Sequence, residues 1–436
     1  ILQNAITNLV SFLDNIMVGQ LGTEQMSGVA IVNQLIFVYN LAIFGAVSAA
    51  SIFGAQYFGK GNHKGHMYSF RFKLYATLLV TGGAILLFLT KGSALISLYL
   101  TDTVGNGATD LALQYGLEYL AIMMVGLIPF AVNQSYATNI KETGQTFIPM
   151  LASFVAVGTN AILDYLMIFG IGPFPELGVQ GAALATVIAR YIEALIVVIW
   201  AHIHRGKNRY LEGAYTGFGI PLAELKAILI KGFPLMMNEV LWAAGMTTVT
   251  QCYSVRGLDV VAGLNIASTI TNLFNIVYLQ LGSCISIVVG QYLGAGKLED
   301  AKDADNKMIV FSVFCCVIMA ALMFVVGGFF PGIYNTTEEI RELATSFIAV
   351  SAIIMPFCAF SHASYFTLRS GGKTVVTFLF DSVFTWVIVV PAAYLLAHFT
   401  GLGIVSIYFL VQGTELIKVI IGYLMVKSNV WVVQMV

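Results

Sequence analysis

The chain of 436 residues is 58% hydrophobic and only 10% charged, and its formal net charge is −1. Soluble domains carry about 25% charged residues, so this composition excludes a water-soluble fold and favours an integral membrane protein. A net charge so close to zero gives no reason to expect nucleic acid or an acidic protein as a partner.

The hydrophobic residues gather in segments long enough to cross a bilayer core of about 30 Å as helices. Stretches rich in polar residues, glycine and proline separate these segments. In chain order the predicted spans are 1–19, 26–53, 68–100, 115–140, 146–170, 178–203, 225–253, 258–290, 307–330, 343–368, 375–399 and 402–426. The sequence therefore predicts an all-α integral membrane protein with about twelve transmembrane helices.

Lysine and arginine are distributed unevenly between the loops. The loops after odd-numbered spans contain only Lys91, Arg256 and Arg341, whereas those after even-numbered spans contain most of the other basic residues, among them Lys60, Lys141, Arg205, Lys297 and Arg369. By the positive-inside rule, the even-numbered loops and both termini face the cytoplasm. We expect a multi-pass protein of the plasma (inner) membrane.

An internal repeat relates the two halves of the chain. When Gly22 is placed on Gly257, further identical residues align without a gap, including Gln56, Tyr57, Gly59 and Gly61 with Gln291, Tyr292, Gly294 and Gly296. Each half contains an even number of spans, so both enter the membrane in the same direction and form a parallel repeat. The prediction is two pseudo-symmetric six-helix lobes, 1–203 and 225–436, joined by a cytoplasmic linker, 204–224.

Acidic residues inside the spans are candidates for function, because a charge at bilayer depth costs roughly 2.5–3.5 kcal/mol. Asp14 and Asp164 lie at matching depths near the outer ends of spans 1 and 5; Asn160 precedes Asp164 by one helical turn, and Thr186 lies about two turns into span 6. Oxygen ligands suit a hard cation, and repulsion between two carboxylates favours protonation. These residues predict a site for Na⁺ or H⁺, unless each carboxyl only bonds a neighbouring helix.

Other polar residues in the spans are weaker candidates. Glu239, in the middle of span 7, is expected to bind a cationic substrate or a second cation, or else to be protonated and bonded to a backbone carbonyl. Gln34, Asn272 and His362 can line a substrate cavity, although such residues more often join or pack between helices.

Local spacing predicts the partners of the remaining charges. Arg190 with Glu193, and Glu415 with Lys418, are three residues apart and predict ion pairs within one helix. Asp381 has no cation on its own helix and is expected to be solvated, as is His66 on the cytoplasmic side. Phosphate-binding loops, zinc-ligand patterns and nucleophile elbows are missing from the sequence, so we expect a transporter driven by an ion gradient, with no cofactor and no enzymatic activity.

Several segments match one known family in order: Asp14–Gly22 (DNIMVGQLG), Gly54–Gly61 (GAQYFGKG) with its copy Gly290–Gly296 (GQYLGAG), Asn160–Gly170 (NAILDYLMIFG), Gly181–Arg190 (GAALATVIAR) and Thr367–Thr374 (TLRSGGKT). Over essentially its whole length the chain resembles the multidrug and toxic compound extrusion (MATE) transporters of the MOP flippase superfamily. The resemblance implies a V-shaped pair of six-helix lobes. It also implies alternating-access efflux of small organic, often cationic or aromatic, compounds in exchange for Na⁺ or H⁺.

The resemblance also assigns residues. It implies cation binding by Asp14, Asn160, Asp164 and Thr186, and a nearby helix-4 tyrosine that corresponds to Tyr119. Members with a cation site in the second lobe pair a helix-7 Glu with a helix-10 Asp. Glu239 matches the first position but Cys358 stands at the second, which argues against a complete second site.

Two rival functions remain. A flippase for lipid-linked precursors or polysaccharides, from the same superfamily, would favour a strongly cationic cavity, and positive charges inside the spans are few. A membrane enzyme or receptor would need a catalytic dyad or an extended soluble domain. The expected partners are the lipid bilayer and a small-molecule substrate, and we expect the chain to act as a monomer.

Overall fold

The computed structural model describes residues 17–100, 106–217, 219–334 and 336–436. Most of predicted span 1, including Asp14, lies outside the described residues. Within them the chain forms helices and no strand. Ten of these helices are long and apolar enough to cross a membrane, or eleven if α4 and α5, which are bent by 43° at their junction, form one span. The predicted all-α membrane fold is confirmed, and the eleven correspond to predicted spans 2 to 12.

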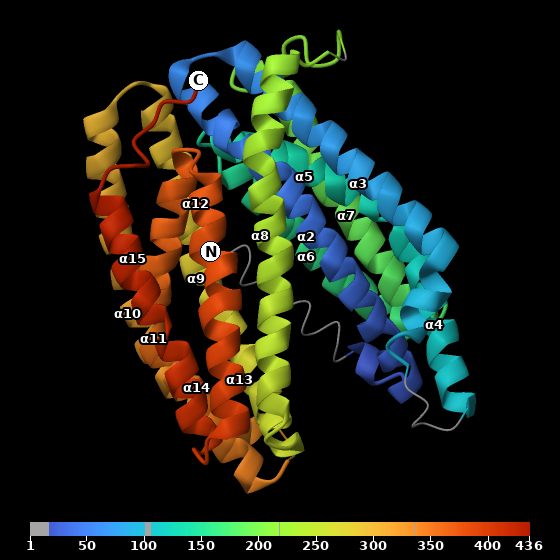
Figure 1. Ribbon diagram of the computed structural model, residues 1–436. Helices are drawn as coiled ribbons and strands as arrows, with labels where there is room; N and C mark the ends of the chain where they lie inside the picture. Colours follow the sequence, from blue (N-terminus) through green and yellow to red (C-terminus); the bar gives the residue numbers. More distant parts are fainter. Residues whose placement is uncertain (1–16, 101–105, 218, 335) are drawn as a thin grey trace. The chain divides into compact units, whose positions relative to one another are not determined.

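The chain divides into two compact units (Figure 1). Among the described residues, the N-terminal unit contains 17–54, 63–100, 106–217 and 219–225, and the C-terminal unit contains 55–62, 226–334 and 336–436. The end of α2, from residue 55 on, thus groups with the C-terminal unit, although the predicted lobe boundary lies at residue 203. The lobe boundaries 1–203 and 225–436 stay predictions.

Helices of the N-terminal unit are α2 (Thr23–Lys60), α3 (His63–Ser97), α4 (Asn106–Val125), α5 (Leu127–Glu142), α6 (Phe147–Ile168) and α7 (Gly178–Ile203). Their core includes Val32 and Ile43 of α2, Met123 of α4 and Ala183 of α7. Small residues let backbones approach closely, as transmembrane packing requires. A Cβ atom on Gly181 would lie 2.6 Å from the carbonyl oxygen of Met167, so α6 and α7 pack almost backbone to backbone here.

Residues 204–217, the predicted linker as far as Gly217, pack on the N-terminal unit. Arg71 of α3 donates hydrogen bonds to the carbonyl oxygens of Ala214 (2.9 Å), Gly213 (2.6 Å) and Gly219 (2.7 Å). Tyr210, in the short 3₁₀-helix Arg209–Leu211, is buried against the rings of His66 and Phe70. Burial raises the pKa of the Tyr210 hydroxyl, and the nearby Glu142 charge acts in the same direction. The docked linker therefore holds a neutral tyrosine against the base of α3.

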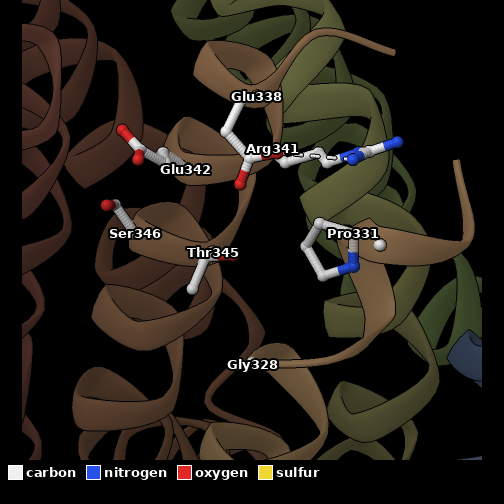
Figure 2. Close-up of a pocket in the computed structure, with 8 residues that line it drawn as sticks. Gly328, Pro331, Glu338, Arg341, Glu342, Thr345 and Ser346 are labelled. Carbon is white, nitrogen blue, oxygen red and sulfur yellow. Dashed lines mark hydrogen bonds and ion pairs between the residues drawn. The ribbon is translucent and has the colours of Figure 1, made fainter. Parts of the chain in front are cut away.

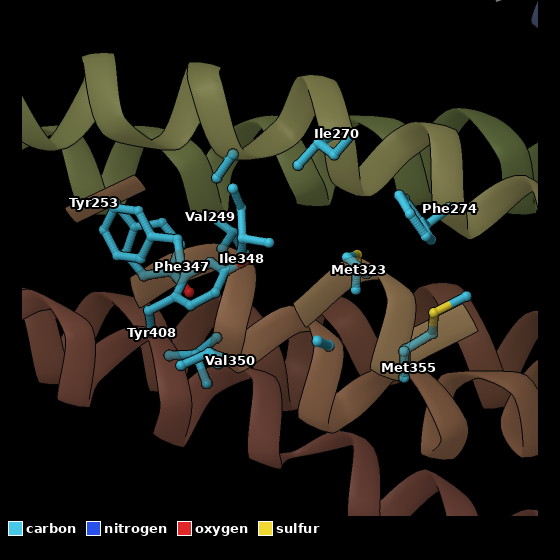
Figure 3. Packing of buried hydrophobic residues seen from close by; sticks show 14 of the residues in the cluster. Val249, Tyr253, Ile270, Phe274, Met323, Phe347, Ile348, Val350, Met355 and Tyr408 are labelled. Atoms are coloured by element: carbon cyan, nitrogen blue, oxygen red, sulfur yellow. The ribbon is translucent and has the colours of Figure 1, made fainter. Parts of the chain in front are cut away.

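The C-terminal unit contains α8 (Leu222–Ser254), α9 (Leu258–Gly294), α10 (Leu298–Gly327), α11 (Glu338–Ser370), α12 (Thr374–Phe378), α13 (Val390–Phe399), α14 (Ile404–Gly413) and α15 (Glu415–Lys427). A 3₁₀-helix, η2 (Phe330–Ile333), follows α10, and two π-helical stretches, η3 (Leu379–Val383) and η4 (Thr385–Val389), join α12 to α13. Figure 3 shows part of its core, where the rings of Phe347 on α11 and Tyr408 on α14 pack together with 4.9 Å between their centres. Phe274 of α9 and Met323 of α10 belong to the same cluster.

The apolar surface of α10 has the character of a lipid-facing helix. At helical spacing it exposes Val310, Phe311, Phe314, Val317, Ile318, Leu322 and Val325. In water this stripe would be strongly unfavourable, because each large apolar side chain gains roughly 1.5–3 kcal/mol on leaving water. Together with the long apolar helices, the stripe indicates that the protein is embedded in the bilayer.

Candidate functional site

The predicted cation residues of spans 5 and 6 lie on α6 and α7. Asn160 and Asp164 are one turn apart on α6, and both are buried. Asn160 donates a hydrogen bond through Nδ2 to Oγ1 of Thr186 on α7 (3.4 Å), and Thr186 donates to the carbonyl oxygen of Ala182 (3.0 Å). The structure thus joins Asn160 to Thr186 with Asp164 one turn away. The fourth predicted residue, Asp14, lies outside the described residues.

A second contact fixes the register of this helix pair. Ser153 of α6 donates a hydrogen bond to the carboxylate of Glu193 on α7. Because the two contacts lie about two turns apart on antiparallel helices, polar groups line the α6–α7 interface from Asp164 to Glu193. Carboxylate, amide and hydroxyl oxygens along this line fit the ligands of a hard monovalent cation.

Arg190 lies one turn after Thr186 on α7, and its predicted pairing with Glu193 is wrong. Among the described residues no ion pair joins the two. The Arg190 guanidinium instead donates to the carbonyl oxygen of Gly126 (3.4 Å) and lies 5.1 Å from the centre of the Phe130 ring. Local spacing failed here because the α4–α5 bend places the Gly126 carbonyl and the Phe130 ring within reach of the guanidinium.

Tyr119 of α4 is buried in the same core cluster as Ala182 and Ala183 of α7. Its hydroxyl donates a hydrogen bond to Oδ1 of Asn33 on α2 (3.3 Å), and it lies within electrostatic reach of Arg190. Tyr119 therefore stands beside the helix that carries Thr186. Gln34, by contrast, is exposed on α2.

In the C-terminal unit, Glu239 is half-buried on α8, within electrostatic reach of Arg369 and Asp381. His362 on α11 is half-buried; its Nδ1 donates to the carbonyl oxygen of Cys358 (3.0 Å), and its ring packs against Tyr278 (4.6 Å between centres). Asn272 is exposed on α9. Glu239 and His362 thus both lie within electrostatic reach of Asp381, whereas Asn272 is on the surface.

Asp381 is not solvated, so that prediction is wrong. Its Oδ1 lies 3.0 Å from Nζ of Lys418 on α15, and its Oδ2 accepts a hydrogen bond from Asn238 on α8 (3.0 Å). The predicted pair of Lys418 with Glu415 is confirmed, at the longer distance of 3.9 Å. Sequence reasoning missed the Asp381–Lys418 pair because the residues are 37 positions apart, on different helices.

His66 is also buried, not solvated. Its Nε2 lies 3.2 Å from Oε2 of Glu142, whose Oε1 is 2.5 Å from Nζ of Lys73. Lys73 also donates a hydrogen bond to Oδ1 of Asn139. Helices α3 and α5 are therefore tied together by a buried charged junction, in place of the solvated cytoplasmic position predicted for His66.

One open hollow of about 440 Å³ lies at the turn between α10 and α11. Figure 2 shows its lining, formed by Gly328, Pro331, Gly332, Glu338, Arg341, Glu342, Thr345 and Ser346. None of the predicted site residues lines it. The hollow lies on a loop predicted to face outward and is not the candidate site.

Long apolar helices that carry buried acidic and basic groups define a polytopic membrane protein of the kind that moves ions or solutes, since such groups in a bilayer usually mark a transport pathway. The family model described as MatE matches residues 1–166 and 234–395. The chain belongs to this family.

Named relatives and solved structures agree with this assignment. A probable multidrug resistance protein NorM of Thermotoga maritima is 23% identical over 406 residues, which cover 93% of this chain and 85% of the relative. A multidrug resistance MATE family transporter of the MOP superfamily, solved in an outward-facing conformation, matches with a TM-score of 0.87 at 19% identity, covering 98% of this chain and 92% of its own. A MOP superfamily transporter from Pyrococcus furiosus matches with the same TM-score, identity and coverage.

Proposed function

We propose that this protein is a secondary antiporter, not an enzyme, that exports small organic compounds in exchange for Na⁺ or H⁺ by alternating access. The observation that carries the proposal is the α6–α7 cluster in which the buried Asp164 and Asn160 lie beside the half-buried Thr186. The family and the multidrug resistance proteins among the relatives support export of organic compounds. We further propose that it works as a monomer in the plasma membrane, with both termini in the cytoplasm.

In this mechanism the inward-moving cation binds at Asp164, with oxygens of Asn160, Thr186 and Asp14 completing its ligands, or a proton binds one of the carboxylates. The hydrogen bond from Asn160 to Thr186 (3.4 Å) is long enough to yield when a cation competes for the same side chains. Because that bond joins α6 to α7, cation binding changes the packing of the two helices. Only a difference in cation affinity between the inward-open and outward-open states can drive transport.

The substrate is proposed to contact other polar and aromatic groups. Tyr119 lies beside α7 in the N-terminal unit, so a shift of α7 on cation binding can change the contact between Tyr119 and a substrate. Glu239 and His362 offer a negative and a titratable group in the C-terminal unit, while Gln34 and Asn272 are exposed and free to meet a ligand. This set suits cationic and aromatic compounds.

The test is efflux of a fluorescent organic cation from proteoliposomes, with Na⁺ and pH gradients applied separately. Asp164→Asn is expected to abolish efflux driven by whichever gradient the unaltered protein uses. Asp110→Asn makes the same chemical change at an exposed position of α4 and is expected to transport normally. Full gradient-driven efflux by Asp164→Asn would refute the site. Failure of the unaltered protein to move organic cations with either gradient would favour the flippase alternative.

A further inference from the structure

The C-terminal unit contains a buried ion network around the side chain of Lys418. The Lys418 side chain is only 8% exposed, and those of Asp381 and Glu415 are each 16% exposed. The Lys418 ammonium lies 3.0 Å from Oδ1 of Asp381 and 3.9 Å from Oε1 of Glu415. Charged side chains at bilayer depth are costly and usually mark a functional site. This network of three therefore calls for a functional explanation.

The helix that carries Asp381 loses its regular α-helical geometry where it meets this network. Asp381 lies in the π-helical stretch η3, and Glu415 is the first residue of α15, which Thr414 alone separates from α14 within the continuous span Ile404–Lys427. Side chains bond to the backbone at both places. Asn238 accepts a hydrogen bond from the amide of Ser382 (3.2 Å), and the Thr414 hydroxyl donates one to the carbonyl oxygen of Val411 (2.7 Å). π-Helical turns often mark functional sites.

The surroundings of the Lys418 ammonium are those of a bound monovalent cation. Carboxylate oxygens lie on two sides, and the rings of Phe380 and Phe384 lie 5.4 Å and 5.8 Å from Nζ. Oxygen ligands and aromatic faces both attract cations. An ammonium on a flexible four-carbon chain is a compact point charge, so Lys418 supplies from within the chain what an ion from solution supplies elsewhere.

The two carboxylates are not satisfied equally. Asp381 accepts hydrogen bonds from both Lys418 and Asn238. Oε1 of Glu415 is buried and has no hydrogen-bond partner among the described residues, with the Lys418 ammonium just beyond bonding distance. A small rotation of the lysine chain would therefore transfer the ammonium from Asp381 to Glu415, which lie on different helices.

We propose that the Lys418 ammonium is the built-in cation of the C-terminal unit, exchanging between Asp381 and Glu415 in place of a free Na⁺ or K⁺. The unit then needs no cation from solution. Shortening Lys418 leaves two buried carboxylates around an empty space, which a monovalent cation fills. This inference does not depend on the cation site proposed for the N-terminal unit.

Thermal unfolding of the purified full-length protein in detergent tests the proposal, with NaCl or KCl replacing choline chloride at constant ionic strength. Every variant carries Asp164→Asn, so that the site proposed for the N-terminal unit does not contribute. This parent is expected to show no saturable response to either cation. Addition of Lys418→Ala is expected to give a saturable rise in melting temperature, about 5 °C at a concentration about 100-fold above the dissociation constant.

Two further variants provide controls. Lys418→Arg keeps the positive charge and is expected to stay unresponsive, and Asp381→Asn added to Lys418→Ala is expected to remove the response. If Lys418→Ala does not fold, Lys418→Gln carries the same expectation. A folded Lys418→Ala or Lys418→Gln protein that ignores both cations would show that the lysine forms only a static ion pair. A response in the parent that Asp381→Asn abolishes would show that a free cation already binds, and would equally overturn the proposal.

Discussion

Lys73→Met is expected to destabilise the N-terminal unit strongly. Lys73 and Glu142 are fully buried, with 2.5 Å between Nζ and Oε1, and Lys73 also bonds Asn139. Removing one partner of a buried ion pair costs about 3–5 kcal/mol, because the remaining charge stays buried. His66, 3.2 Å from the other carboxylate oxygen, can take up a proton and replace part of the lost charge. We therefore expect a loss of about 3 kcal/mol, at the lower end of that range.

The assay is reversible unfolding in mixed detergent and SDS micelles, followed by circular dichroism. Lys64→Met makes the same change at an exposed position of α3 and is expected to alter the free energy of unfolding by less than about 0.5 kcal/mol. Glu142→Gln combined with Lys73→Met also removes the buried carboxylate charge of Glu142 and is expected to recover about 2 kcal/mol of the loss. A cost below about 1 kcal/mol for Lys73→Met would mean that water reaches Glu142, and the argument from burial would be wrong.

Three other outcomes follow from the N-terminal unit. Asp164→Asn should lower gradient-driven efflux at least about tenfold in proteoliposomes while Asp110→Asn leaves it unchanged, because only the first removes a buried carboxylate from the α6–α7 interface. Gly181→Ala should cost about 1–3 kcal/mol in the same unfolding assay, since its new methyl group would meet the α6 backbone, whereas Gly158→Ala, which has open space around it, should be neutral or slightly stabilising. Arg71→Ala should increase the rate of proteolytic cleavage within residues 204–217, because it removes three hydrogen bonds that hold the linker; an unchanged rate would mean that the linker is held by its apolar contacts alone.

The helices could be predicted from the sequence because the bilayer imposes a length and an apolar composition on each one separately. The contact between Asn160 and Thr186 was also within reach, since equal depth on neighbouring helices restricts which side chains can meet. The hydropathy pattern gives the position of each residue along the membrane normal. It is enough to place residues in a layer of the membrane.

Side-chain pairing across helices could not be predicted in the same way. The i,i+3 rule selected Glu415 for Lys418, but the shorter contact is to Asp381 on another helix. It selected Glu193 for Arg190, whose guanidinium turns to the α4–α5 bend instead. Helix rotation and bends decide such contacts, and a periodic pattern that is apolar on all sides contains little information about rotation. His66 was predicted to be solvated because it precedes the apolar segment that begins at residue 68, but α3 already begins at His63.

The repeat preserves the place of a polar junction while changing its charge. Lys141–Gly144 and Arg369–Gly372 are corresponding exits from the two halves, so Asn139 corresponds to Thr367. Asn139 bonds the buried ammonium of Lys73 on α3, whereas Thr367 donates a hydrogen bond to the buried carboxylate of Asp305 on α10 (2.5 Å). In each unit, the helix that follows the repeated segment (residues 56–59 or 291–294) contacts a later helix of the same unit. In the N-terminal unit α3 contacts α5 through a lysine, and in the C-terminal unit α10 contacts α11 through an aspartate. Since the sign of a buried charge decides which ion it attracts, two units built on one repeat can hold different ions.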